Sequence, residues 1–314
     1  MSRIHEALKK AELERAGTAP PETPAVEFHA HVSAPMSDGN GKSTVTRVLT
    51  ETKRAQEPGR LEWSDVVAGC SHPAWHLDPS TSVFLDPVLT VDSAEQFRSL
   101  RSRLYQMRND QTLQTLVVTS ALPGEGKTFV TSNLGQAIVR QHERRALILD
   151  GDLRRSHLHT AFRAPSRPGL SDYLRGDADL LTVIQQGLGG GLCVIPGGNP
   201  TANPTELLCN GRLKGLLEQV AGVFDWILID SPPCLPVADA NILADICDGV
   251  LFVVKARSTP SAVVEKAGRE LRGRNVVGVV MNQVDQHALG YSSHYGSPYI
   301  GEPQGSKESP GSKE

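Results

Sequence analysis

The sequence is poor in cysteine and has no long hydrophobic run, and both absences exclude classes of protein. Its 314 residues contain five cysteines, an odd number, with no Cys-x-x-Cys pair, which argues against a disulfide scaffold or a zinc site. The longest apolar runs, such as "GVLFVV", fall far short of the ~20 residues that span a bilayer. The opening "MSRIHEALKK" lacks the apolar core of a secretory signal. We therefore expect a cytoplasmic protein with reduced thiols.

Excess positive charge is also missing. The net charge is −3, so no nucleic-acid partner is predicted. The ten histidines lack the spacing of metal ligands, and we expect no structural metal. The length allows one α/β domain of about 200 residues with tails, or two smaller domains.

Four regions differ in composition. Residues 1–16 have the apolar spacing of an amphipathic helix, which would pack on its own domain or dock on a partner. Residues 17–90 hold eight of the 21 prolines and are predicted to be a mostly disordered or loosely packed lead-in. Residues 91–286 carry the regular patterns of a folded domain. Residues 287–314 are rich in Gly, Ser and Pro and are predicted to be a flexible tail.

Within residues 91–286 short β-rich runs alternate with helical patterns. This alternation predicts a doubly wound, mostly parallel α/β sheet of the P-loop NTPase type, with helices on both faces. We expect helices at 94–108, from 127, through 171–186, at 211–222, from about 238 and at 260–272. The expected strands are 115–120, 146–150, 192–196, 226–230, 250–256 and 276–282.

Two glycine-rich loops compete for the role of phosphate binder. The first, "GNGKST" at 39–44, follows a polar, proline-rich stretch and not a strand, so its match is a chance one. The second, Ala121–Thr128 ("ALPGEGKT"), lies between an expected strand and an expected helix, as a phosphate loop requires. Because Ala121 stands where the general pattern has glycine, a glycine-rich helix entry without a ligand stays possible.

Three aspartates end expected strands near this loop. Asp150 and Asp152 follow "ALIL", and Asp230 follows "WILI". The carboxyl ends of parallel strands share one edge, where ligands bind. A single aspartate in such a place is usually a turn or helix cap. Three beside a phosphate loop predict Mg²⁺ ligands and a proton acceptor.

Together these motifs resemble those of the bacterial tyrosine kinases, the P-loop autokinases linked to capsule and exopolysaccharide synthesis. The resemblance covers roughly residues 91–299 and includes "ALPGEGKT", "LILDGDLR", "ILIDSPP", "PGLSDYLRG" and "NPTELL". The spacing of Glu95, Arg98 and Arg101 is similar to that by which family members assemble into rings. "MSRIHEALKKAE" looks like the leader of some soluble members.

The resemblance implies ATP and Mg²⁺ as cofactors and a role for each site residue. Lys127 would neutralise phosphate charge, and Thr128, Asp152 and Asp230 would hold Mg²⁺. Asp150 would orient or accept the tyrosine proton, although the division of roles among the aspartates stays open. Arg154 would reach a phosphate or lie solvated. The residues implied in nucleotide binding are Pro123, Gly124, Glu125, Gly126, Lys127, Thr128, Phe129 and, at the adenine, Asn282.

Three of the five tyrosines, Tyr291, Tyr295 and Tyr299, lie in the tail. They are expected phosphoacceptors, or else a hydrophobic latch. The tail would leave the last strand at the nucleotide edge and reach its own site or that of a neighbour in a ring.

These features predict an ATP-dependent protein-tyrosine autokinase acting in trans. The alternative is a partner-switching ATPase of the chromosome-partition or septum-positioning type. Such ATPases carry a second lysine where this loop has Leu122, and the tail tyrosines would then lack a role. A non-catalytic regulatory subunit is disfavoured by the intact site. The resemblance implies three partners: further copies of the chain, a transmembrane polysaccharide co-polymerase that activates the kinase at the membrane, and a protein-tyrosine phosphatase.

Overall fold

The computed structural model describes residues 61–85, 90–187 and 190–284. All of them lie in one compact unit of the chain, Gln56–Glu314. The expected helix at 1–16, the glycine-rich loop at 39–44 and the three tail tyrosines lie outside the described residues. Among those described, no helix combines the length and hydrophobicity that a membrane crossing requires.

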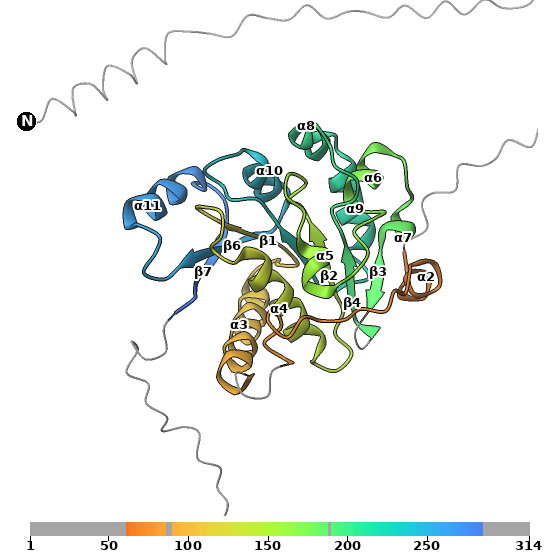
Figure 1. The fold of residues 1–314 in the computed structure, drawn as a ribbon, viewed down its shortest axis with the longest axis horizontal. Helices are drawn as coiled ribbons and strands as arrows, with labels where there is room; N and C mark the ends of the chain where they lie inside the picture. The colour runs from red at the N-terminus through yellow and green to blue at the C-terminus, as the bar shows by residue number, and fades with distance from the viewer. Residues whose placement is uncertain (1–60, 86–89, 188–189, 285–314) are drawn as a thin grey trace, which may run out of the picture. The chain divides into compact units, whose positions relative to one another are not determined.

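The described residues form a seven-stranded sheet in the order β3-β4-β2-β5-β1-β6-β7 (Figure 1). Every neighbouring pair is parallel except β3 with β4 at one edge. This confirms the doubly wound, mostly parallel α/β fold. The strands are β1 (Thr115–Ser120), β2 (Ala146–Asp150), β3 (Gln185–Gly187), β4 (Leu192–Ile195), β5 (Trp226–Asp230), β6 (Gly249–Lys255) and β7 (Val276–Asn282).

Helices cover both faces of the sheet (Figure 1). One face is covered by α3 (Thr90–Asp110), α4 (Lys127–Val139) and α5 (Leu158–Phe162). The other is covered mainly by α6 (Leu170–Arg175), α8 (Pro204–Cys209), α9 (Arg212–Val220), α10 (Asp239–Ile246) and α11 (Ser261–Glu270). Two short helices, α2 (Trp63–Gly69) and α7 (Leu180–Val183), pack together beside them.

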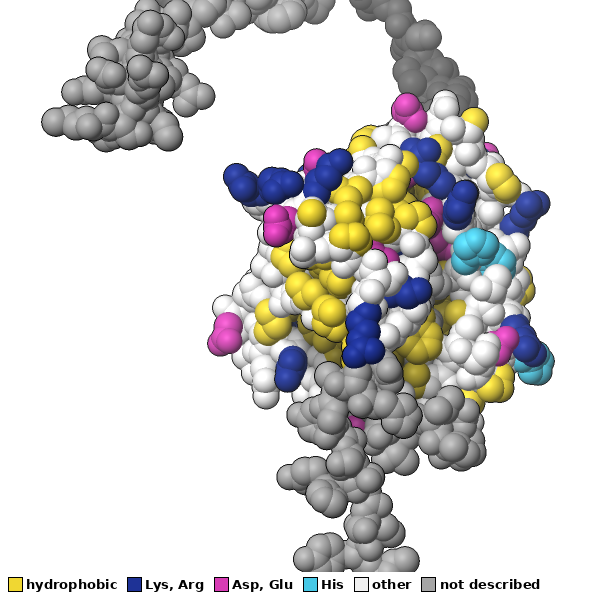
Figure 2. All heavy atoms as spheres, turned by 60° about the vertical axis from the view of Figure 1, so that its left-hand side comes forward, with side chains coloured by type: hydrophobic (Ala, Val, Ile, Leu, Met, Phe, Trp, Pro, Cys, Tyr) yellow, Lys and Arg dark blue, Asp and Glu magenta, His cyan; other side chains and the backbone are white. Residues whose placement is uncertain are grey.

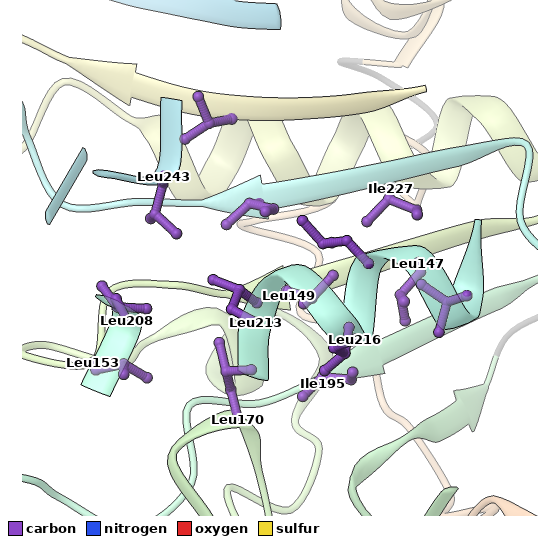
Figure 3. Close-up of a cluster of buried hydrophobic side chains, with 14 of the residues drawn as sticks. Leu147, Leu149, Leu153, Leu170, Ile195, Leu208, Leu213, Leu216, Ile227 and Leu243 are labelled. Atoms are coloured by element: carbon purple, nitrogen blue, oxygen red, sulfur yellow. The ribbon is translucent and has the colours of Figure 1, made fainter. Parts of the chain in front are cut away.

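The core follows from alternation along the strands. On β2, Leu147 and Leu149 belong to the cluster under α9, whereas Ala146 and Ile148 belong to the cluster under α4. Successive side chains on a strand point to opposite faces, so an uninterrupted apolar run fills two cores. Figure 3 shows the first cluster, with Leu213 and Leu216 of α9 packed toward Leu149 and Ile195 of the sheet.

The predicted helix through 171–186 is wrong in its last part. Gly176, at φ 88°, ends α6, and a second short helix, α7, follows. The chain then forms β3, which pairs antiparallel with β4. Gly187 in β3 lies against the Trp75 ring, where a Cβ would collide with it. Pairing to a sheet edge therefore overrode the local helical pattern.

The expectation of a mostly disordered stretch is wrong for residues 61–85. Val66 of α2 is fully buried. Further on, the Ser82 hydroxyl donates to Gln136 Oε1 at 2.8 Å, and the Val83 N–H donates to Asn133 Oδ1 at 2.9 Å. Both acceptors lie on α4, the helix that follows the glycine-rich loop. The folded domain therefore begins before the predicted boundary at residue 90.

β7 is parallel to β6 and ends at the same edge as β1, β2 and β5. The last strand therefore ends at the carboxyl edge of the sheet, as predicted. Its apolar run is not buried, because β7 is an edge strand: Val279 is 58% and Met281 56% exposed. Figure 2 brings this side of the molecule forward and shows hydrophobic side chains gathered on it.

Candidate active site

The loop between β1 and α4 is shaped by two glycines with left-handed backbone. Gly124 has φ 79° and Gly126 has φ 92°, a region that other residues adopt only under strain. α4 begins directly after Gly126 and runs for 13 residues. A turn of this kind at the start of a long helix presents N–H groups and a positive dipole end to an anion. The local geometry fits the predicted phosphate loop.

Lys127 is buried at the first position of α4, with 9% of its surface exposed. Among the described residues its ammonium group has no hydrogen bond and no ion pair within 4 Å. Its positive charge acts on Asp152 and Asp230 and lowers the pKa of both, against the larger effect of burial. A nearly buried cation without a close counter-ion is unfavourable by itself. A phosphate bound at the loop would supply the missing negative charge.

Two carboxyl groups end neighbouring strands in register. Asp150 on β2 pairs with Asp230 on β5, and both are almost wholly buried. Burial raises the pKa of both carboxyl groups, and repulsion by Asp230 raises the pKa of Asp150 further. Such a pair resists double ionisation unless a cation lies near it. The arrangement therefore favours a bound cation or a shared proton.

Hydroxyl groups hold these carboxylates in place. The Thr128 hydroxyl donates to Asp230 Oδ2 at 2.6 Å. The Ser156 hydroxyl and the Leu158 N–H donate to Asp150 Oδ2 at 2.6 and 3.1 Å. Ser156 was not among the predicted site residues, because a serine six residues after a strand has no distinguishing signal.

Asp152 lies beyond the end of β2 and is half-buried. Its negative charge raises the pKa of both Asp150 and Asp230, so the three groups share one electrostatic environment. Within the described part of the chain, no three His, Cys, Asp or Glu side chains are close enough to hold a metal by themselves. Mg²⁺ commonly binds through one or two carboxylates, with phosphates and water completing its shell. The residues present fit that kind of site, with Thr128 as a further oxygen ligand.

Three predicted site residues make contacts that differ from those expected. Arg154 forms a two-point ion pair with buried Asp239, at 2.7 and 3.1 Å, while its own side chain stays 39% exposed. The Phe129 ring packs edge-on against Phe97 of α3. Asn282 donates from Nδ2 to the Glu125 carbonyl at 2.9 Å and thus touches the loop backbone. Pro123 is exposed at the loop surface.

The residues expected at a ring contact lie on α3. Arg98 and Glu95 form an exposed ion pair at 3.0 Å. Arg101 donates to the Ala137 carbonyl at 2.7 Å and so binds the last turn of α4 in the same chain. Arg101 is therefore already engaged within the domain that it was predicted to join to a neighbour.

Comparison with known proteins places the chain in a family. Residues 113–279, just over half of the chain, match the family model described as cellulose biosynthesis protein BcsQ. The chain is 32% identical over 203 residues to the tyrosine-protein kinase CpsD of Streptococcus agalactiae, covering 64% of this chain and 87% of that protein. The chain belongs to the BcsQ family and groups with the bacterial tyrosine kinases.

Two further members of the tyrosine-kinase family extend the comparison. The tyrosine-protein kinase ptk of Acinetobacter johnsonii is 34% identical over 212 residues, which are 65% of this chain but 29% of that protein. The chain thus matches less than a third of the length of this relative. The solved kinase domain of Escherichia coli tyrosine kinase ETK aligns with a TM-score of 0.60 and 34% identity, covering 68% of this chain and 85% of that one.

Proposed function

We propose that this chain is an ATP-dependent protein-tyrosine autokinase that regulates the polymerisation and export of a capsular or extracellular polysaccharide. One observation carries the proposal: a nearly buried lysine without a close counter-ion lies between a left-handed glycine turn and three carboxyl groups. Such an arrangement is complementary to a phosphate chain and its metal. The tyrosine-kinase relatives support the reaction class.

In this proposal ATP and Mg²⁺ bind at the carboxyl edge of the sheet. Mg²⁺ supplies charge neutralisation to the phosphates. Lys127 and the loop N–H groups bind the phosphate oxygens, and Asp152, Asp230 and the Thr128 hydroxyl hold the metal. The γ-phosphoryl group leaves the β-phosphate and bonds to a tyrosine oxygen, which gives up its proton. Asp150 lies beside Asp230 at the same edge of the sheet and, in this proposal, orients or accepts that proton.

The acceptors follow from the accessibility of the tyrosines. Of the five tyrosines, Tyr105 packs against Trp226 with its hydroxyl buried, and Tyr173 is 8% exposed. The Tyr105 oxygen is therefore out of reach of a second molecule without unfolding, and the Tyr173 side chain is largely buried. This supports phosphorylation on Tyr291, Tyr295 and Tyr299, which follow β7 in the chain.

The proposal includes assembly and partners. Copies of the chain form a ring through α3, with the exposed pair Glu95 and Arg98 as contacts, and each tail is phosphorylated by a neighbour. The protein acts at the inner face of the cytoplasmic membrane, recruited and activated by a transmembrane polysaccharide co-polymerase. A protein-tyrosine phosphatase resets it. Up to two negative charges per phosphotyrosine would repel neighbouring tails and loosen the ring.

Incubation with Mg·ATP tests this proposal. Wild type, Lys127→Met and a triple Tyr291/Tyr295/Tyr299→Phe variant are compared by phosphotyrosine blot and by mass spectrometry, with the cytoplasmic segment of the co-polymerase added in a parallel series. We expect a signal from wild type alone.

Each variant separates one part of the proposal. Wild-type signal from the triple variant would exclude the tail as the acceptor. Wild-type signal from Lys127→Met would exclude the site. ATP hydrolysis by wild type without phosphotyrosine, in both series, would favour the partner-switching ATPase instead.

A further inference from the structure

Glu125 lies in the middle of the phosphate loop, yet its side chain points into the protein. The residue is 2% exposed. Its Oε2 accepts from the Leu122 N–H at 2.7 Å, and its Oε1 accepts from the Lys255 N–H at 3.3 Å and from the Thr259 hydroxyl. One carboxyl group thus ties the start of the loop to the end of β6 and to the turn after it.

Asn282 ties the same loop to β7. Its amide donates to the Glu125 carbonyl at 2.9 Å. It also lies so close to Gly126 that a Cβ on that glycine would collide with the amide nitrogen. The loop residue immediately before Lys127 is therefore fixed against the last strand of the sheet.

The loop itself has few other means of keeping its shape. Gly124 and Gly126 are the residue types with the greatest backbone freedom. At Gly124 a Cβ would meet nothing within 4 Å, so no neighbour packs on it there. An anion site made of backbone N–H groups binds well only when those groups are held in position beforehand. Hydrogen bonds from outside the loop can supply that order.

We propose that Glu125, Thr259 and Asn282 form a brace that positions the N–H groups of the phosphate loop. In the proposed kinase they are positioning residues, so the inference rests on the proposed function. Asn282, expected to contact adenine, acts on the phosphates through the loop instead. Glu125 contributes through its buried carboxyl group and does not itself meet the nucleotide with its side chain.

The brace makes a prediction that an adenine contact does not. Loss of a loop support weakens binding of every ligand that carries the phosphate chain, whether or not it carries a base. Loss of an adenine contact weakens ATP and leaves inorganic tripolyphosphate unchanged. Isothermal titration of both ligands, with Mg²⁺, into wild type and Asn282→Ala separates the two roles. We expect both affinities to fall by a similar factor, about three- to tenfold, as for one lost hydrogen bond.

Thr259 offers a matched pair of variants outside the loop. Thr259→Ser keeps the hydroxyl and is expected to bind both ligands within about twofold of wild type. Thr259→Val keeps the shape, removes the donor and is expected to bind both about three- to tenfold more weakly. Glu125→Gln replaces one acceptor by a donor facing a backbone N–H, and the expected loss is about tenfold or more. If Glu125→Gln fails to fold, the Thr259 pair still decides.

Kinetics distinguish positioning from a general loss of structure. Because the loop holds the phosphates in both ground and transition states, Thr259→Val should raise the KM for ATP and leave kcat near wild type. A lower kcat with an unchanged KM for ATP would contradict the brace. So would unchanged tripolyphosphate binding in Asn282→Ala, Thr259→Val and Glu125→Gln. If wild type itself binds neither ligand, the proposed function fails and the brace with it. Wild-type binding with unaffected variants overturns the brace alone.

Discussion

An aspartate lies at each end of strand β5, and the two carboxyl groups have different surroundings. Asp225 precedes the strand and accepts from the Arg144 guanidinium at 2.7 Å and from the Arg145 N–H at 2.9 Å. Asp230 ends the strand, buried beside Asp150, with only hydroxyl donors and a distant lysine to offset its charge. Asp225, at the amino end, is neutralised by neighbouring groups of the chain, whereas Asp230, at the carboxyl end, has no cation within ion-pair distance among the described residues.

A cavity among the described residues follows the same division. It has a volume of about 720 Å³ and lies at the amino end, lined by Arg108, Arg144 and Arg145 among others. Arg108 donates to the Asp225 carbonyl at 2.7 Å, and Arg145 stacks on the Trp63 ring. These cations already have partners within the chain, whereas Lys127 at the carboxyl end has no close counter-ion among the described residues.

The largest effect on stability is expected from removing residues 61–85, which pack against the rest of the domain. Deleting residues 1–85 removes Val66 from the core, Trp63 from Arg145, and the partners of Gln136 and Asn133 on α4. Burial of one such aliphatic side chain is worth about 1.5–3 kcal/mol, and each stranded polar group costs about 1–3 kcal/mol more. We expect a loss of more than ~4 kcal/mol in urea unfolding. Deleting residues 1–60 alone is the control. Equal stability of the two truncated proteins would contradict the packing of residues 61–85.

Asp230→Asn tests the role of the buried carboxyl pair at the carboxyl end of the strands. Thr128 can still donate to the amide oxygen, but the repulsion with Asp150 disappears. We expect autophosphorylation to fall by about 10²–10³, as when one preorganised electrostatic group is lost. Metal-free protein should at the same time become more stable at pH 8, by on the order of 1 kcal/mol. A variant that loses both activity and stability would indicate that Asp230 serves the fold, as Asp225 does.

The sequence predicts the features that have a local pattern, and it does not predict those that depend on contacts between distant residues. The glycine spacing before Lys127 and the aspartates after apolar strands are local patterns, and both the fold and the main site residues follow from them. The partners of Glu125 are Lys255 and Thr259, some 130 residues away, and no local pattern connects them. The burial of Val66 could not be predicted either, because the proline and polar residues around it give the segment the composition of a disordered region. β3 was missed because three residues pair with β4 only after the sheet exists.

The pH dependence of stability sharpens the comparison. In the metal-free fold the pKa of Asp150 is raised to about 8 and that of Asp230 to about 7, so the fold keeps protons that the unfolded chain has already lost. The contribution of these two groups to stability is therefore greatest at low pH and falls as pH rises between about 4 and 8. One such proton changes the free energy of unfolding by at most about 1.4 kcal/mol per pH unit. We expect the thermal midpoint of metal-free protein to decrease from pH 6 to pH 7.5, and Asp230→Asn to reduce that slope. A flat profile in wild type would show that the two carboxyl groups are solvated.

The smallest effect is expected at the amino end, from Arg144→Met. The variant keeps the aliphatic length but removes the ion pair with Asp225 and the contact of the guanidinium with the Tyr105 ring. Arg144 is 40% exposed, so solvent screens the pair, and the Arg145 N–H still donates to Asp225. The expected loss is below about 1 kcal/mol of unfolding free energy, with kcat and the KM for ATP unchanged in the folded fraction. Because the substitution lies at the opposite end of β5 from Asp230, an altered KM would mean that the two ends are mechanically coupled through the strand. An unaltered KM with reduced stability is the result that a division of labour between the ends requires.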